Sequence, residues 1–199
     1  MRFVVLREGS VAQYLSHVAM IHKLAYHRGH FSSCFSVSKL EEYYANLIAN
    51  SDISLVAIDE DEQCAGFVIA GYSVSQGTRK FTRDNKIYLA MLLLLNPSIL
   101  LTKLHGRVCS LVGSSEASFA KFRLLSISVN PSSQSSGVGS AMLTFFEERL
   151  REMNVDYYGL SVKGDNTNAI RFYEKNGFIE EKEDMGSRYF YKLVPQEEI

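Results

Sequence analysis

The 199-residue chain has few of the features that mark several large classes of protein. Its three cysteines, Cys34, Cys64 and Cys109, are widely spaced and form no Cys-x-x-Cys pair, which argues against a disulfide scaffold and against a zinc site. The formal net charge is −1 at pH 7, with acidic and basic residues interspersed, so the basic stripe typical of nucleic-acid-binding proteins is missing. We therefore expect no metal, no nucleic-acid partner and a reducing, cytoplasmic location.

Long hydrophobic runs are also missing. The dense apolar run 87–95 is broken by Asn96-Pro97, well short of the roughly 20 residues that a membrane-spanning helix needs. Near the N-terminus only residues 3–6 form an apolar run, which is too short for the core of a signal peptide, so we do not expect export. With 46% hydrophobic residues the chain is long enough for one well-buried domain, and we expect a single domain over residues 1–199.

The apolar periodicity predicts a mixture of helices and strands. Ser36 or Ser38 is expected to cap the second helix, and the acidic run 59–62 is expected to form a hairpin turn. His17 and His22 are expected on the first helix as ordinary polar positions. The predicted strands are 3–6, 53–58, 64–72, 125–129, 158–162, 178–185 and 188–193, and the predicted helices are 11–26, a second one ending at 48, and one from 140 to 153.

Residues 77–119 read as a helical insertion that the predicted sheet does not need. The simplest interpretation is a pair of helices whose apolar faces cover one side of the sheet or meet a second copy of the chain. Basic residues precede the run 87–95, and Lys103 and Arg107 follow it, as in a helix attracted to anionic lipid. Peripheral membrane contact through residues 87–107 is therefore an alternative, and the sequence leaves both a monomer and a homodimer open.

The segment 125–141 predicts a binding site for a pyrophosphate. A strand that alternates apolar residues with serine ends at an Asn-Pro pair, and a helix begins after Gly137 and Gly139. The first turn of a helix has unpaired backbone N–H groups and the positive end of the helix dipole, while glycines leave an anion room to approach. A P-loop would need Lys-Ser/Thr at Ser140-Ala141, and a dinucleotide-binding turn would need a small residue at Met142, so neither template is met.

A second motif lies about two dozen residues downstream, where the strand 158–162 is followed by Asp-Asn-Thr-Asn-Ala-Ile-Arg-Phe-Tyr-Glu-Lys-Asn-Gly-Phe at 165–178. Together the two motifs resemble the GNAT superfamily of N-acetyltransferases, which bind acetyl-CoA at a Gln/Arg-x-x-Gly-x-Gly/Ala turn. The resemblance covers roughly residues 124–193. It implies a mixed α/β fold in three layers, with a mainly antiparallel central sheet splayed at its centre, helices on both faces and an acetyl-CoA-binding core at 120–193.

The resemblance also implies the residues of the cofactor site. The backbone of Ile127, Ser128 and Val129 would bind the pantetheine arm, and a backbone N–H near Val129 is the candidate donor to the oxyanion. Asn166 would contact the cofactor. Tyr173 would contact it too and give a proton to the departing CoA thiolate, with core packing as its alternative role. The turn that would hold the pyrophosphate comprises Gln134, Ser135, Ser136, Gly137, Val138, Gly139 and Ser140.

The base that would deprotonate the acceptor is not fixed by the sequence. Some family members place a catalytic Glu on the strand before the Asn, and the corresponding residue here is Ser161. A histidine titrates in the useful range, and the region between the first two predicted helices often lines the acceptor side in this superfamily. The candidates are His27, His30, Glu41, Glu42 and a chain of ordered water.

The expected reaction is transfer of an acetyl group from acetyl-CoA to a primary amine of a small molecule. The leucine-rich insertion resembles that of GNAT members encoded with bacterial surface-polysaccharide machinery, which suggests an amino sugar, free or linked to a nucleotide or a lipid. Two alternatives stay open: acetylation of a protein or peptide, and a CoA-binding sensor without turnover. Ser161 mildly favours the sensor, while Tyr173 and the motif around it weigh against it.

Overall fold

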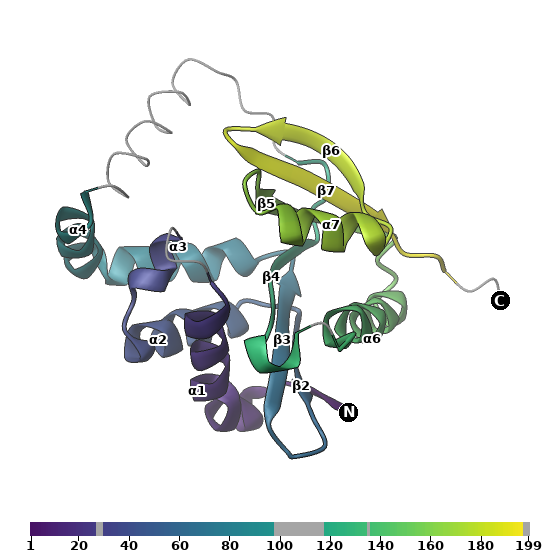
Figure 1. Ribbon diagram of the computed structural model, residues 1–199, viewed down its shortest axis with the longest axis horizontal. Coiled ribbons are helices and arrows are strands. Elements are labelled where there is room, and N and C mark those ends of the chain that lie inside the picture. The colour runs from purple at the N-terminus through teal and green to yellow at the C-terminus, as the bar shows by residue number, and fades with distance from the viewer. Residues whose placement is uncertain (27–29, 98–117, 135, 197–199) are drawn as a thin grey trace.

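The computed structural model describes residues 1–26, 30–97, 118–134 and 136–196 (Figure 1). These residues form a seven-stranded sheet in the order β1-β2-β3-β4-β5-β7-β6. The strands are β1 (Arg2–Val5), β2 (Ile53–Ile58), β3 (Cys64–Gly71), β4 (Arg123–Val129), β5 (Tyr157–Lys163), β6 (Ile179–Asp184) and β7 (Ser187–Leu193). The helices are α1 (Glu8–Ala25), α2 (Val37–Ile48), α3 (Val74–Asp84), α4 (Lys86–Leu95), α6 (Val138–Glu152) and α7 (Thr167–Lys175), with short 3-10 turns η1 (Phe31–Cys34) and η2 (Pro131–Ser133).

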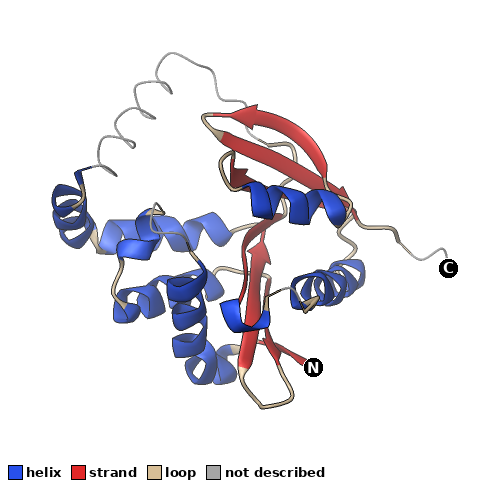
Figure 2. Ribbon diagram, in the orientation of Figure 1, coloured by secondary structure: helices blue, strands red, loops and turns tan. Residues whose placement is uncertain are grey.

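Helices cover both faces of the sheet, and each face has its own hydrophobic core (Figure 2). Successive residues of a strand point to opposite faces, so Leu55 of β2 joins the core with α6 and α7 while Val56 joins the core with α1, α2 and α3. Every residue of β2 and β3 is buried. Cover on both faces explains why these two strands are continuous apolar runs rather than alternating ones. The predicted three-layer arrangement is confirmed.

The sheet splits at its centre, between β4 and β5. These parallel strands share a single paired position, Arg123 with Gly159, whereas β4 pairs antiparallel with β3 from residue 123 to residue 129. β5 pairs with β7 from Tyr157 to Lys163 instead. Beyond Leu124, no strand in the described ranges pairs with the side of β4 that faces β5. Figure 1 shows the two halves of the sheet diverging at this point.

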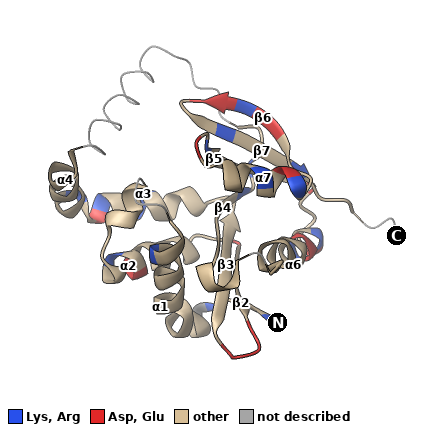
Figure 3. Cartoon of the chain, in the orientation of Figure 1, with Lys and Arg blue, Asp and Glu red and all other residues tan. Residues whose placement is uncertain are grey.

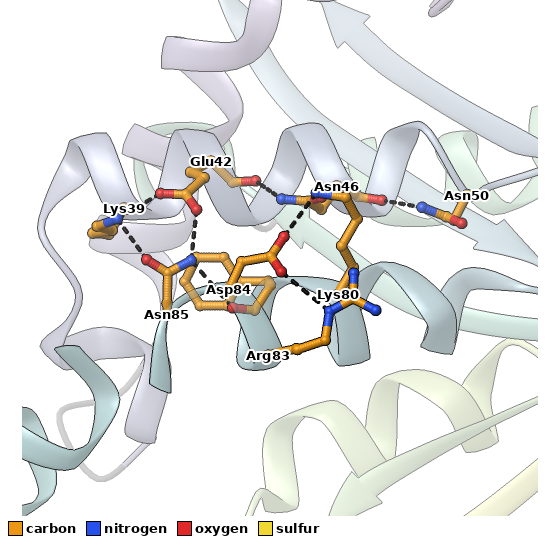
Figure 4. A network of polar contacts seen from close by, with 9 residues as sticks. Lys39, Glu42, Asn46, Asn50, Lys80, Arg83, Asp84 and Asn85 are labelled. Atoms are coloured by element: carbon orange, nitrogen blue, oxygen red, sulfur yellow. Dashed lines mark hydrogen bonds and ion pairs between the residues drawn. The ribbon is translucent and has the colours of Figure 1, made fainter. Parts of the chain in front are cut away.

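A polar network fixes the junction of α3 and α4 against α2 (Figure 4). Asn85 is buried and is the residue at which α3 ends and α4 begins. The oxygen of its side-chain amide accepts from Lys39 Nζ at 2.6 Å, and the nitrogen donates to Glu42 Oε1 at 2.5 Å. At Gly77, α3 comes so close to α2 that any side chain would overlap the backbone of Asn46. The base of the predicted insertion is therefore firmly attached to the helical layer.

The two described helices of the insertion differ in burial: α3 buries Val74 and Phe81 in the helical-side core, whereas the apolar run in α4 lies at the border of that core. Helix α4 has no buried residue: Tyr88, Leu89 and Leu92 only border the core, and four large apolar side chains are exposed. These exposed residues are Ile87, Met91, Leu94 and Leu95. The remainder of the insertion, with Lys103, Arg107 and Cys109, lies outside the described residues, so contact with a second copy or a membrane stays a prediction. In the described ranges no helix is both long and apolar enough to cross a membrane.

Both signs of charge are spread over the described helices and strands (Figure 3). Acidic residues gather only locally, in the turn between β2 and β3 and along β6.

Candidate active site

The N-terminus of α6 has backbone N–H groups without an acceptor among the described residues. Gly137, the residue before the helix, has a φ of +83°, a left-handed backbone conformation that residues other than glycine rarely adopt. The Ala141 N–H donates to Gly137 O at 3.0 Å, but the N–H groups of Val138, Gly139 and Ser140 have no acceptor among the described residues. No described atom lies within 4 Å of the point where a Gly137 side chain would begin. The helix end can therefore receive an anion.

The second glycine of the motif also has a packing role that was not predicted. A Cβ atom on Gly139 would lie 3.1 Å from two ring carbons of Phe172 and 3.6 Å from Val129 Cγ2. Gly139 therefore allows α7 to pack against the start of α6 and the end of β4. Of the two glycines, only Gly137 has open space where a side chain would begin.

The turn between β4 and α6 is held by its own polar groups. Asn130 Oδ1 accepts from the Ser132 N–H at 3.2 Å, and Ser136 Oγ donates to Ser133 O at 2.6 Å. The exposed Gln134 side chain donates back to Val129 O at 3.4 Å. These bonds tie the predicted pyrophosphate turn to the end of β4. Ser135 lies outside the described residues.

The backbone of β4 is irregular where the sheet splits. In the register with β3, Ser126 pairs with Ile69 and Leu124 with Ala70, so Leu125 between them has no partner on β3. Its side chain is 39% exposed. A bulge of this kind turns backbone groups away from a regular ladder and is common next to active sites. The predicted pantetheine-binding residues, which are Ile127, Ser128 and Val129, follow directly along the strand and are buried or half-buried.

Helix α7 carries the two remaining predicted residues. Asn166 is exposed at its start and caps it, with Oδ1 accepting from the Ala169 N–H at 3.2 Å. The ring of Tyr173 packs against those of Phe178 and Phe190, with centroids 5.2 and 6.2 Å away. Its hydroxyl has no hydrogen-bond partner in the described part of the chain, and burial raises its pKa, with a smaller contribution from Tyr26. Core packing explains the ring of Tyr173 but leaves a protonated hydroxyl available.

The sequence from residue 21 to residue 178 matches the model of the acetyltransferase (GNAT) family. The chain belongs to the GNAT family. One similar solved structure is the ribosomal-protein-S18-alanine N-acetyltransferase from Escherichia coli, with 15% identity over 99% of this chain and 96% of that chain and a TM-score of 0.56. A second is the PaiA N-acetyltransferase from Thermoplasma acidophilum in complex with coenzyme A, with 14% identity over 97% of this chain and 99% of that chain and a TM-score of 0.56. A third is the spermidine/spermine N-acetyltransferase SpeG from Vibrio cholerae, with 15% identity over 97% of this chain and 94% of that chain and a TM-score of 0.51. At these identities the likeness shows the fold alone. No curated protein matches the sequence.

This GNAT protein also has a buried polar cluster at β4 that the sequence analysis missed. Ser126 Oγ lies 3.1 Å from the hydroxyl of Tyr26, at the end of α1, and 3.4 Å from that of Tyr44 on α2. Burial raises the pKa of both phenols, so both stay protonated near neutral pH. The serines that alternate with apolar residues in β4 were a usable signal, because a serine facing a helical layer needs a polar partner there.

His22 is part of this cluster, and the prediction that it is an ordinary polar position was wrong. The side chain is only 2% exposed and stacks on Tyr26 at 3.8 Å. Nδ1 lies 2.7 Å from Tyr44 OH, and Nε2 lies 2.9 Å from Ser32 Oγ. Burial, followed by the nearby His30 and Lys23, lowers the pKa of His22 to about 3, so the imidazole is neutral. His17 is exposed, as expected.

The candidate bases occupy different surroundings in the GNAT fold. His27 lies outside the described residues, and His30 is half-buried with Nδ1 2.6 Å from Ser32 Oγ. Hydrogen bonds from Lys39 and Asn85 lower the pKa of Glu42, which makes it a weak base. The other positions weighed in the sequence are Glu41, half-buried on α2, and Ser161, exposed on β5. Among the described residues no three His, Cys, Asp or Glu side chains gather where they could hold a metal ion.

Proposed function

We propose that the protein transfers the acetyl group of acetyl-CoA to a primary amine of a small molecule. The observation that carries this proposal is the position of the open N-terminus of α6 directly beyond the unpaired side of β4. The helix end suits the diphosphate of CoA. Residues 127–129 pair with β3 on one side, and their backbone groups that point away from β3 suit the amide groups of the pantetheine arm, which would add to β4 as a short extra strand.

The proposed reaction uses groups on both sides of β4. The neutral amine attacks the thioester carbonyl, a C–N bond forms, and a backbone N–H at the Leu125 irregularity or near Val129 stabilises the oxyanion. The C–S bond then breaks, and the thiolate takes the proton of the Tyr173 hydroxyl. Tyr173 recovers a proton from the nitrogen as the amide forms. A phenol suits this role because it stays protonated at neutral pH until the thiolate leaves.

For the acceptor we propose an amino sugar, free or linked to a nucleotide or a lipid. The leucine-rich insertion resembles that of GNAT members encoded with bacterial surface-polysaccharide machinery, which supports this class of acceptor. The surface of α3 and α4 supports it too, because exposed basic residues, Arg79 and Lys86, precede the exposed apolar residues Ile87 and Leu94 in the sequence. Such a surface suits an acceptor with both charged and apolar parts. Free thiols at Cys34 and Cys64 support a reducing, cytoplasmic location.

Release of free CoA in the presence of different amines tests the proposal. The panel holds glucosamine, a UDP-linked amino sugar, spermidine, a peptide with an N-terminal alanine and a reaction without amine, and mass spectrometry identifies the acetylated product. We expect the sugar amines to react fastest. A faster peptide would point to protein acetylation, and acetyl-CoA binding without amine-dependent thiol would point to a sensor, the reading that Ser161 favours. Sedimentation of the same sample distinguishes a monomer from a homodimer.

A further inference from the structure

We propose that a buried chain of hydrogen bonds running from Ser126 to His30 carries away the proton that an ammonium acceptor loses before acetylation. This inference rests on the proposed acetyl transfer. Ser126 lies on β4 directly before Ile127, the first residue proposed to bind the pantetheine arm, in the stretch where no described strand pairs with the side of β4 that faces β5. The inner end of the chain is therefore next to the proposed site of the thioester, and its outer end is a half-buried histidine.

The hydrogen-bond chain has four links. Ser126 Oγ lies 3.4 Å from Tyr44 OH, which lies 2.7 Å from His22 Nδ1. On the other side of the imidazole, Nε2 lies 2.9 Å from Ser32 Oγ, which lies 2.6 Å from His30 Nδ1. Ser126, Tyr44, His22 and Ser32 are all buried. Bulk water therefore does not provide an equivalent route along this path.

Every link can be oriented in the same direction. Ser126 donates to Tyr44, Tyr44 donates to Nδ1 of His22, Nε2–H of His22 donates to Ser32, and Ser32 donates to His30. Each hydroxyl then gives one hydrogen bond and accepts one, and the imidazole accepts on one nitrogen and donates from the other. Only a neutral imidazole can do this, since an imidazolium donates from both nitrogens. Burial keeps His22 neutral, with a pKa of about 3.

The position of the outer residues is held by Lys23. Its ammonium group donates to Ser33 O at 2.7 Å and to Phe35 O at 2.8 Å, which holds the segment that carries Ser32 against α1. In the described ranges, the titratable groups that face His22 are Lys23 and Tyr26 on its own helix, Tyr44 on α2, and His30 before η1. No carboxylate is among these groups, so none of them would hold a proton as a carboxylic acid at His22.

The proton balance shows which proton needs the chain. A primary alkylamine is an ammonium ion near pH 7, and its reaction with acetyl-CoA to give an amide and CoASH leaves one proton over. An amine that is already neutral leaves none, because the proton lost from nitrogen ends on the thiol through Tyr173. In the proposed path the ammonium gives its extra proton to Ser126, each member passes one proton outward, and His30 releases one to solvent. An imidazole suits this last step because it can accept a proton on one ring nitrogen and release one from the other.

Two isosteric acceptors separate this role from a structural one. Ethylamine is an ammonium ion at pH 7, whereas methoxyamine has the same shape and is neutral. Tyr44→Phe and Ser32→Ala each remove one hydroxyl from the chain, and Tyr43→Phe removes the neighbouring hydroxyl on α2, which interacts with Thr78 instead. Each variant is checked for an unchanged circular dichroism spectrum and for acetyl-CoA affinity before kcat/KM is measured with both amines from pH 6 to pH 10.

At pH 7 we expect kcat/KM for ethylamine to fall roughly 10- to 100-fold in Tyr44→Phe and Ser32→Ala, the range typical of acid–base groups. The loss should become smaller as the pH rises toward the pKa of ethylamine, where more of this amine is neutral. The kcat/KM for methoxyamine should change by less than about twofold in these variants. Tyr43→Phe should match the wild type with both amines. An equal loss with both amines, or no loss with ethylamine, overturns the proton path. If the wild-type protein binds acetyl-CoA but acetylates neither amine nor any member of the panel above, the proposed function itself fails.

Discussion

The backbone of Gly139 lies against the ring of Phe172, so that a Cβ atom at this glycine would meet two ring carbons at 3.1 Å. This contact joins α6 to α7 beside the end of β4. We predict that Gly139→Val destabilises the protein by about 1–3 kcal/mol, because a branched side chain must displace the ring from a packed site. Urea unfolding measures the change. Thr144→Val, which places the same side chain at an exposed position of α6, is the control, and an equal effect of both variants would contradict a packing role for Gly139.

Tyr173 has a packed ring and an unused hydroxyl, which leads to a prediction about turnover. We expect Tyr173→Phe to lower kcat by about 10²-fold or more and to leave acetyl-CoA affinity within about twofold, because the ring contacts with Phe178 remain and only the proton donor is lost. Tyr157→Phe, at an exposed position on β5, should change neither quantity. Single-turnover kinetics separate the chemical step from product release. An unchanged chemical step would assign the proton to another donor.

The buried neutral His22 predicts how stability depends on pH. Its pKa is about 3 in the folded protein and about 6.5 in an unfolded chain, so between these values the unfolded state binds a proton that the folded state does not. The free energy of unfolding should therefore fall by up to about 1.4 kcal/mol per pH unit as the pH drops below 6.5, levelling near pH 3.

Urea unfolding at pH 7, 6 and 5 checks the His22 prediction against two variants. His22→Gln cannot titrate in this range, so its stability should fall less steeply with acid than that of the wild type. His17→Gln, at an exposed position on the same helix, should follow the wild type. If the wild type and His22→Gln have parallel pH profiles, the imidazole does not become protonated on unfolding and the account of its burial is wrong.

Glu147 is a buried carboxylate whose Oε1 accepts from Tyr158 OH and from Lys192 Nζ, each at 2.6 Å. We predict that Glu147→Gln lowers the free energy of unfolding by about 1–3 kcal/mol, because it leaves the Lys192 ammonium group without its counter-ion in a poorly solvated position. The exposed neighbour Glu148 gives the matched variant, Glu148→Gln, which should stay within about 0.5 kcal/mol of the wild type. Thermal and urea unfolding should agree on the order of the two.

The parts of the fold that were predictable depend on neighbouring residues in the sequence. β2 and β3 were predictable because burial on both faces makes them continuous apolar runs. Ser36 was predictable as a helix cap because a capping side chain bonds a backbone N–H only a few residues away, here that of Lys39 at 3.3 Å. The open N-terminus of α6 was predictable for the same reason, since Gly137 and the helix that follows are contiguous. In each case the physical cause lies within a few residues.

The parts that were missed depend on residues far apart in the sequence. His22 was predicted to be an ordinary polar position because its partners, Tyr44 on α2 among them, come from elements that are distant in the sequence. The role of Gly139 depends on Phe172 of α7 in the same way. The exposure of α4 also needed the structure, because an apolar sequence does not say which surface it contacts.

The central claim is that the open end of α6 holds the diphosphate of acetyl-CoA, and titration calorimetry with Gly137→Glu tests it most directly. Gly186→Glu is the matched control, because Gly186 also has a positive φ, of +71°, and open space in front of it, but lies in the turn between β6 and β7. Both variants should lose similar stability from backbone strain. We predict that the wild type and Gly186→Glu bind acetyl-CoA with similar affinity and that folded Gly137→Glu binds at least about tenfold more weakly, because its carboxylate repels the diphosphate at short range. Equal affinity of all three proteins, or no binding by the folded wild type, would contradict the account.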